Sequence, residues 1–171
     1  MDDEGRGLPL ELEQLHEDSY GWALACCGRR PAEAREVLQA AYLKVLDGRA
    51  RFDGRSSFRT WLFGVIRRTA AEERRREALR RLRLVSISAA PEPPDPALGA
   101  ADRVERSEDS GRLVAALSRL PRRQREVLDL VFYHDLTIAE AATVMGVGVG
   151  SARVHYERGK ARLRALLGRR S

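Results

Sequence analysis

The stretch from Thr137 to Leu167 constrains the fold most, because it predicts two helices joined by a tight glycine turn. Thr137 and Glu140 have the spacing of a capping box, in which each side chain accepts a backbone N–H at the start of a helix. Gly146 follows the first predicted helix, and glycine takes a positive φ there without the steric penalty of a Cβ atom. The sequence therefore predicts a helical hairpin with a sharp corner.

The second helix of this hairpin has one apolar face, and its other faces are polar or basic. The apolar residues recur at spacings of three and four, as the helical period requires: Ala152, Tyr156, Gly159, Leu163 and Leu166. A helix-turn-helix with a basic second helix has the geometry that enters the major groove of DNA. The alternative is a hairpin with a solvated basic face. The agreement of capping box, glycine corner and one-sided apolar stripe favours DNA binding.

The charge of the chain is unevenly distributed. The 171 residues carry a net charge of +6, which favours a polyanionic partner. Residues 1–20 hold seven acids and one arginine, whereas residues 65–83 hold eight arginines and three acids. Pairing within a helix cannot neutralise that basic excess, so contact with phosphate groups is the better explanation. Trp61 precedes this basic run, and it is either a core residue or an aromatic that stacks on an unpaired base.

The cysteines and histidines give no sign of a metal site or of catalysis. Cys26 and Cys27 are the only cysteines, and neighbours in sequence rarely pair, so we expect no disulfide and a reducing compartment. The three histidines, at positions 16, 134 and 155, are scattered. No apolar run approaches the roughly 18 residues of a membrane span. The expectation is a cytoplasmic protein without metal, cofactor or catalytic residues.

The N-terminal half shows helical periodicity throughout. We expect an amphipathic helix over residues 8–26 after a short frayed tail, and a second helix over 32–47. A third helix is expected to begin at Phe58, capped by Ser56 or Ser57, and to continue into the basic run.

Residues 86–107 have a different composition, with four of the seven prolines and a net negative charge. They predict a flexible linker between a domain at 8–85 and a domain at 108–168. The predicted fold class is all-α, with two small helical domains and a helix-turn-helix in the second.

Four segments in this order resemble the extracytoplasmic-function (ECF) sigma factors, the small two-domain specificity subunits of bacterial RNA polymerase. They are EVLQAAYLKVL at 36–46, FRTWLFGVIRRTAAEERRR at 58–76, LPRRQREVLDL at 120–130 and GVGVGSARVHYERGKARLR at 146–164. The resemblance implies core RNA polymerase and promoter DNA as partners, and an anti-sigma factor as a regulator. It implies a transcription initiation factor that has no catalysis of its own.

The resemblance also implies roles for individual residues. Glu36 and Gln39 would grip the clamp coiled coil of core polymerase. The residues along the −10 element would be Trp61, Arg67, Arg68, Arg74, Arg75 and Arg76. The residues at the −35 element would be Thr137, Ser151, Arg153, Val154, His155, Glu157, Arg158 and Lys160. Among these, Thr137 and Ser151 would lie near phosphate, and Lys160 would add backbone attraction.

The sequence departs from the family pattern at several of these positions. Arg68 replaces the usual asparagine of the melting helix, and Glu72 replaces the aspartate that follows it. Ala40 stands where an acid usually follows the clamp-binding glutamine, and His155 stands where arginine is common. These departures concern promoter contacts and the strength of polymerase binding.

Three other classes of protein are alternatives to a sigma factor. A helix-turn-helix transcriptional regulator with a response-regulator-type output domain fits the C-terminal half, but residues 8–83 lack the strand pattern of a receiver domain. A small metal-dependent hydrolase has no nucleophile elbow or phosphate loop to support it. A repressor dimerised by the N-terminal helices would bind promoter DNA tightly without polymerase.

Overall fold

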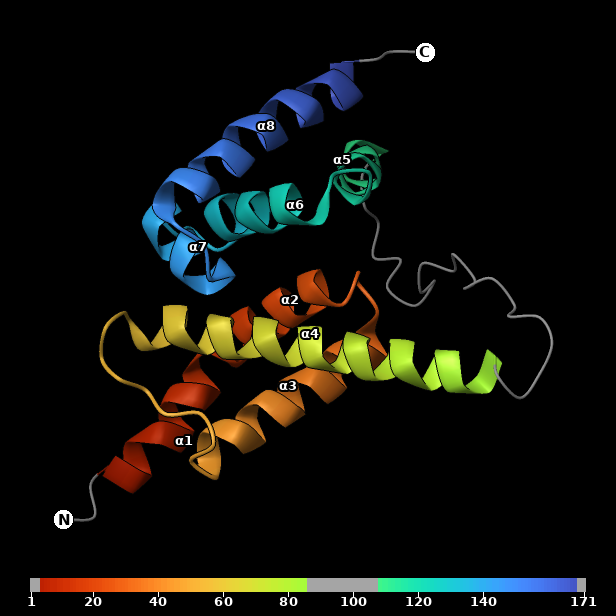
Figure 1. Ribbon diagram of the computed structural model, residues 1–171. Helices are drawn as coiled ribbons and strands as arrows, with labels where there is room; N and C mark the ends of the chain where they lie inside the picture. The colour runs from red at the N-terminus through yellow and green to blue at the C-terminus, as the bar shows by residue number, and fades with distance from the viewer. Residues whose placement is uncertain (1–3, 86–107, 169–171) are drawn as a thin grey trace. The chain divides into compact units, whose positions relative to one another are not determined.

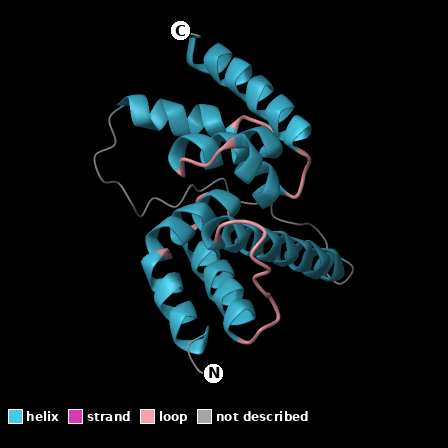
Figure 2. Cartoon of the chain, turned by 90° about the vertical axis from the view of Figure 1, so that its left-hand side faces the viewer, coloured by secondary structure: helices cyan, strands magenta, loops and turns pink. Residues whose placement is uncertain are grey.

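The computed structural model describes residues 4–85 and 108–168, and every regular element in those two ranges is a helix (Figures 1 and 2). The predicted all-helical fold is therefore confirmed. The described residues fall into two units, one with 4–51 and 65–85 and the other with 52–64 and 108–168. The expected linker, 86–107, lies outside the described residues.

The helix expected over residues 8–26 is in fact two helices, α1 (Glu4–Gln14) and α2 (His16–Cys26). The backbone bond from Leu15 N–H to the Glu11 carbonyl persists at 3.1 Å, so the interruption at Leu15 is a kink. Both α1 and α2 contact α3, and Leu12 on α1 and Trp22 on α2 are both buried. The residues just before Leu8, expected to fray, belong to α1 from Glu4 onward.

Helices α3 (Pro31–Leu46) and α4 (Phe58–Val85) begin as the sequence predicts. Pro31 opens α3, where its missing N–H costs no hydrogen bond. The cap of α4 is Ser57, whose Oγ accepts the Thr60 N–H at 3.1 Å. Buried side chains of α2, α3 and α4 form the core of this unit: Trp22, Ala23, Cys26, Ala34, Val37, Leu38, Ala41, Val45, Val65, Ile66 and Ala70.

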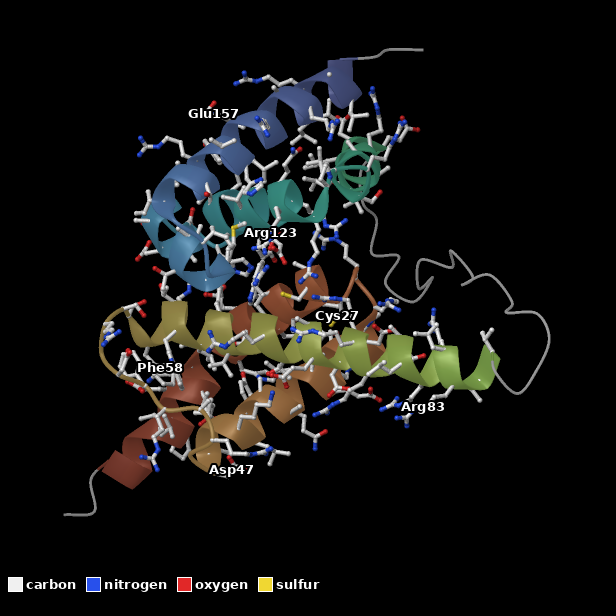
Figure 3. The ribbon with its side chains drawn as sticks, in the orientation of Figure 1. Cys27, Asp47, Phe58, Arg83, Arg123 and Glu157 are labelled. Carbon is white, nitrogen blue, oxygen red and sulfur yellow. The ribbon has the colours of Figure 1, made fainter. Side chains whose placement is uncertain are left out.

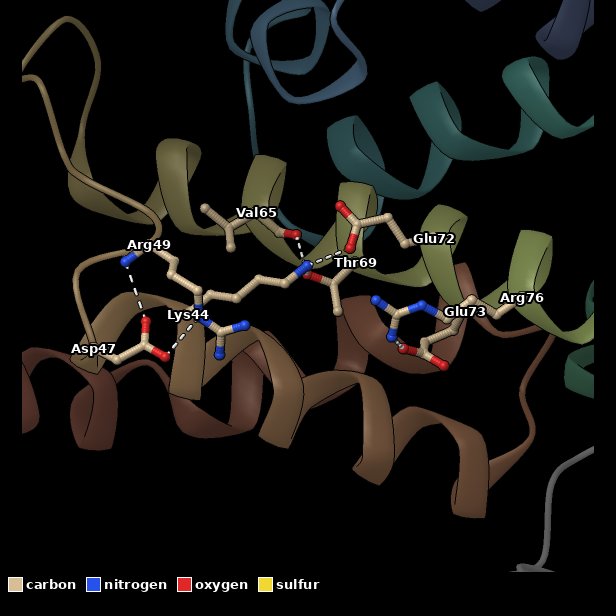
Figure 4. A network of polar contacts seen from close by, with 8 residues as sticks. All are labelled: Lys44, Asp47, Arg49, Val65, Thr69, Glu72, Glu73 and Arg76. Carbon is tan, nitrogen blue, oxygen red and sulfur yellow. Dashed lines mark hydrogen bonds and ion pairs between the residues drawn. The ribbon is translucent and has the colours of Figure 1, made fainter.

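Two basic side chains, Lys44 and Arg74, connect the middle of α4 to its neighbours. Lys44 Nζ donates to Thr69 Oγ1 at 3.2 Å and to Glu72 Oε2 at 2.5 Å, which joins α3 to α4 (Figure 4). Arg74 Nη1 donates to the Cys26 carbonyl at 2.9 Å, which joins α4 to the end of α2.

The C-terminal helices contain the predicted helix-turn-helix. They are α5 (Glu108–Ser118), α6 (Arg122–Leu128), a π-helical turn η1 (Asp129–Tyr133), α7 (Ile138–Met145) and α8 (Val149–Gly168). The capping box is present, with Thr137 Oγ1 accepting from Glu140 N–H at 3.1 Å and Glu140 Oε2 accepting from Thr137 N–H at 2.8 Å. Gly146 ends α7 with φ of 65°, as expected.

Helix α6 contacts both helices of the helix-turn-helix. Arg123 Nη1, on α6, donates to the Met145 carbonyl at the end of α7 at 3.1 Å. On α8, a Cβ atom at Gly159 would lie 3.2 Å from Leu128 Cδ1 and 3.3 Å from the Gln124 carbonyl oxygen. Glycine at this position therefore allows α6 and α8 to pack closely.

Candidate nucleic-acid interface

The outer face of α8 carries four of the predicted −35 residues. Arg153, Val154, Glu157 and Arg158 are all exposed, whereas Ala152 and Gly159 on the opposite side are buried. Neither Arg153 nor Arg158 forms an ion pair within the described ranges. The packing of one side of α8 thus leaves a polar face with two available guanidinium groups, and Glu157 points outward among them (Figure 3).

The other predicted −35 residues surround this face in different ways. Ser151 is exposed in the first turn of α8, and His155 is half-buried. The Thr137 hydroxyl is already engaged, because it donates to Glu140 Oε2 at 2.9 Å within the capping box. Lys160 Nζ lies 3.1 Å from Glu157 Oε1 and 4.4 Å from the centre of the Tyr156 ring, so its charge is directed to the flank of α8.

The predicted −10 residues do not share one face of α4. Trp61, Arg68 and Arg75 recur every seven residues and lie on one side of the helix, and both arginines are exposed. Arg74 lies on another side and donates to the Cys26 carbonyl. Arg76 lies 2.8 Å from Glu73 on its own helix, and Arg67 is half-buried.

Trp61 belongs to an aromatic cluster that the sequence reasoning missed. Its ring centre lies 5.4 Å from Phe52 and 5.3 Å from Phe58, and the two phenylalanine rings are 5.5 Å apart. Phe52 remains 42% exposed. Phe52 lies before the start of α4, and no local pattern in the sequence indicates that its ring contacts those of Phe58 and Trp61.

The predicted polymerase-binding residues Glu36 and Gln39 are exposed on the outer side of α3. Further along the same side, Leu43 and Leu46 are 52% and 54% exposed. These two leucines were missed, although their offsets of four and seven from Gln39 are the helical period. The outer side of α3 is therefore polar in its first half and apolar in its second.

The two cysteines are buried, and they form no disulfide with each other. Burial, with a smaller contribution from Glu33, raises the pKa of Cys27 to about 11. No group of three or more metal-ligating side chains occurs in the described part of the chain. None of the described helices is both long and apolar enough to span a membrane.

Comparison with known proteins identifies the class. Residues 12–80 match the family model "Sigma-70 region 2", and residues 110–163 match "Sigma-70, region 4". These matches place a polymerase specificity module before the helix-turn-helix, so the regulator with a response-regulator output domain is not favoured.

Curated relatives narrow the class to a family. The chain is 34% identical over 160 residues to the RNA polymerase sigma factor CarQ of Myxococcus xanthus, covering 92% of this chain and 88% of CarQ. It is 32% identical over 144 residues to the ECF RNA polymerase sigma factor RpoE of Cereibacter sphaeroides, covering 80% and 74% of the two chains. The chain belongs to the ECF family of RNA polymerase sigma factors.

Solved structures share the fold. The sigma factor RpoE of Bartonella quintana, in complex with the anti-sigma factor NepR, matches with a TM-score of 0.72 and 19% identity over the whole of both chains. CnrH, in complex with the cytosolic domain of CnrY, matches with a TM-score of 0.65 and 22% identity over 97% of this chain and 90% of the other.

Proposed function

We propose that this sigma factor binds promoter DNA and core RNA polymerase through three separate helix faces. We propose also that it acts in the cytoplasm and has no catalysis of its own. The outer face of α8 reads the −35 element, one side of α4 contacts the −10 element, and the outer side of α3 binds core polymerase. The family directs promoter-specific initiation of transcription. The proposal concerns which residues of this chain do so, within domains at 8–85 and 108–168.

The exposed group of Arg153, Val154, Glu157 and Arg158 is the observation that carries the −35 assignment. An arginine in the major groove can bind guanine O6 and N7 together, and a glutamate can accept from cytosine N4. Thr137 caps the start of α7 and Ser151 lies in the first turn of α8, and the backbone N–H groups at a helix start favour phosphate. Lys160 and His155 contribute at the edges of the interface.

Trp61, Arg68 and Arg75 carry the −10 assignment, because they share one side of α4. The arginines attract phosphate, and the tryptophan is available to an unstacked base. Arg67 and Arg76 act as secondary contacts. Arg74 has a structural role through its bond to the Cys26 carbonyl.

Glu36 and Gln39 carry the assignment of the polymerase-binding face, with Leu43 and Leu46 as its apolar end. Apolar side chains beside polar ones are the composition expected at a protein interface. An anti-sigma factor is the proposed regulator, because the structurally similar RpoE of Bartonella quintana was solved in complex with the anti-sigma factor NepR.

The test is to mix the purified protein with bacterial core RNA polymerase, separate the mixture by size exclusion, and transcribe a template library with the complex. Co-elution and initiation at sites that share −35 and −10 elements are expected. Failure to co-elute, with duplex DNA still bound by the free protein, would contradict the proposal.

A further inference from the structure

Four side chains of the C-terminal helices form a connected series of contacts that ends on the outer face of α8. The rings of Phe132, in η1, and Tyr156, on α8, are stacked, with centres 5.9 Å apart and planes 24° apart. Lys160 Nζ lies 4.4 Å from the centre of the Tyr156 ring and 3.1 Å from Glu157 Oε1. The series therefore connects the outward-pointing Glu157 to a residue of η1.

Lys160 is held by its neighbours on α8. Tyr156 lies four residues before it and Glu157 three, and side chains at both spacings are adjacent on a helix surface. An ammonium group has three N–H donors and is attracted to the face of an aromatic ring. Only 25% of the Lys160 side chain is exposed. Its ammonium group is thus directed to the ring and the carboxylate.

Glu157 remains accessible although it is paired. Its side chain is 61% exposed, and within the described ranges its only polar contact is the one between Oε1 and Lys160. A glutamate side chain that is free in solvent adopts several rotamers. The contact with Lys160 restricts these rotamers and leaves Oε2 able to accept a hydrogen bond.

We propose that Lys160 positions Glu157 to accept a hydrogen bond from the exocyclic amino group of a cytosine in the −35 element. The inference rests on the proposed function, since it takes the outer face of α8 as the reader of that element. A glutamate in the major groove can accept from cytosine N4. Lys160 is then a positioning residue that acts through Glu157, in place of the phosphate contact that the sequence implied.

The charges of the pair favour this assignment. A carboxylate alone would be repelled by the phosphates on both sides of the groove. The ammonium group of Lys160, 3.1 Å away, offsets that charge, so the pair approaches DNA with no net charge. The pair therefore contributes base preference more than overall attraction to DNA.

The first measurement locates the base that Glu157 contacts. The full chain, bound to core polymerase, is titrated with duplexes that carry each of the four bases in turn at every position of the −35 element. Fluorescence anisotropy gives the affinities. Glu157→Ala is expected to remove a preference for cytosine at one position of the element.

The second measurement tests Lys160 at that position. Lys160→Met removes the ammonium group and keeps a long apolar stem, and we expect it to lower the preference for cytosine about threefold or more. In a protein that already carries Glu157→Ala, the same substitution should change the preference no further. The ratio of affinities for two duplexes is unaffected by a loss that is equal on every sequence.

Two further comparisons separate positioning from charge and from folding. Arg162→Met also removes one positive charge from α8, at an exposed position, and is expected to leave the preference for cytosine unchanged. Tyr156→Leu removes the ring beneath Lys160 and should lower the preference, whereas Tyr156→Phe keeps the ring and should not. Thermal unfolding of each variant is recorded alongside.

The outcomes distinguish this inference from the proposed function. If Lys160→Met weakens binding equally on all duplexes and the preference for cytosine persists, Lys160 is a phosphate contact and the inference falls, while the −35 assignment of Glu157 stands. An equal change in preference with and without Glu157 would also overturn it. If Glu157→Ala itself leaves every base preference unchanged, the −35 assignment of Glu157 falls, and the role of Lys160 falls with it.

Discussion

The basic helices α4 and α8 carry their arginines in different ways. In α8 one side packs closely through Ala152 and Gly159, so Arg153 and Arg158 are confined to the opposite face. In α4 the arginines are distributed around the helix, and Arg74 donates to the Cys26 carbonyl. The number of arginines in a helix therefore does not give the number of guanidinium groups that are available to a partner. That number depends on where the arginines lie relative to the packed side of the helix.

The largest effect is expected from a variant that disrupts the packed side of α8. Gly159→Leu should lower the free energy of unfolding of the C-terminal helices by about 3 kcal/mol, because the side chain meets Leu128 and Gln124 at once. Chemical denaturation, monitored by circular dichroism, measures this free energy of unfolding. Gly111→Leu, where a Cβ atom meets nothing within 4 Å, is the control. A fully stable Gly159→Leu variant would show that α8 is not fixed by this contact.

A smaller effect is expected on the readout of the −35 element. Arg153→Ala should weaken binding to −35 DNA by about 1–3 kcal/mol if its guanidinium binds a base in two places. Fluorescence anisotropy with promoter and scrambled duplexes measures it, and the loss should be confined to the promoter duplex. An equal loss on both duplexes would make Arg153 a backbone contact, like those expected in α4.

Arg74→Ala tests whether one arginine of α4 is structural. We expect a loss of about 1–2 kcal/mol in the free energy of unfolding, because the Cys26 carbonyl loses a charged donor. The salt dependence of DNA binding should stay the same as in the unchanged protein. If the stability is unchanged and the salt dependence falls, Arg74 contacts DNA after all.

The smallest effect is expected at single exposed arginines of α4. Arg75→Ala should reduce the slope of log affinity against log salt by about 1, with little change in stability. Arg76→Ala should reduce it less, because Arg76 is paired with Glu73 at 2.8 Å. Titrations with −10 DNA at several salt concentrations measure both slopes. Equal slopes for the two variants would remove the distinction between the sides of α4.

The sequence was sufficient to predict a structural feature where that feature depends on residues that are close together along the chain. The capping box at Thr137, the turn at Gly146 and the start of α3 at Pro31 are local in this sense, and the structure has all three. The exposed face of α8 also follows from its period. The Leu15 kink could not be predicted in this way, because it depends on how two helices fit against α3.

The features that the sequence reasoning missed depend on contacts between distant segments. Arg74 lies within a run of similar arginines, and only the position of the α2 terminus distinguishes it. The contact of Phe52 with Trp61 requires the turn before α4 to fold back onto that helix.

The contacts of Lys44 and Arg74 in the middle of α4 also determine its rotation about its own axis. Lys44 holds Thr69 and Glu72 from one side, and the Cys26 carbonyl holds Arg74 from the other, within six residues of chain. Hydrogen bonds on two sides of a helix prevent its rotation about its own axis. The direction in which Arg68 and Arg75 leave the helix is thereby set in the free protein, so the proposed contacts with the −10 element require no rotation of α4.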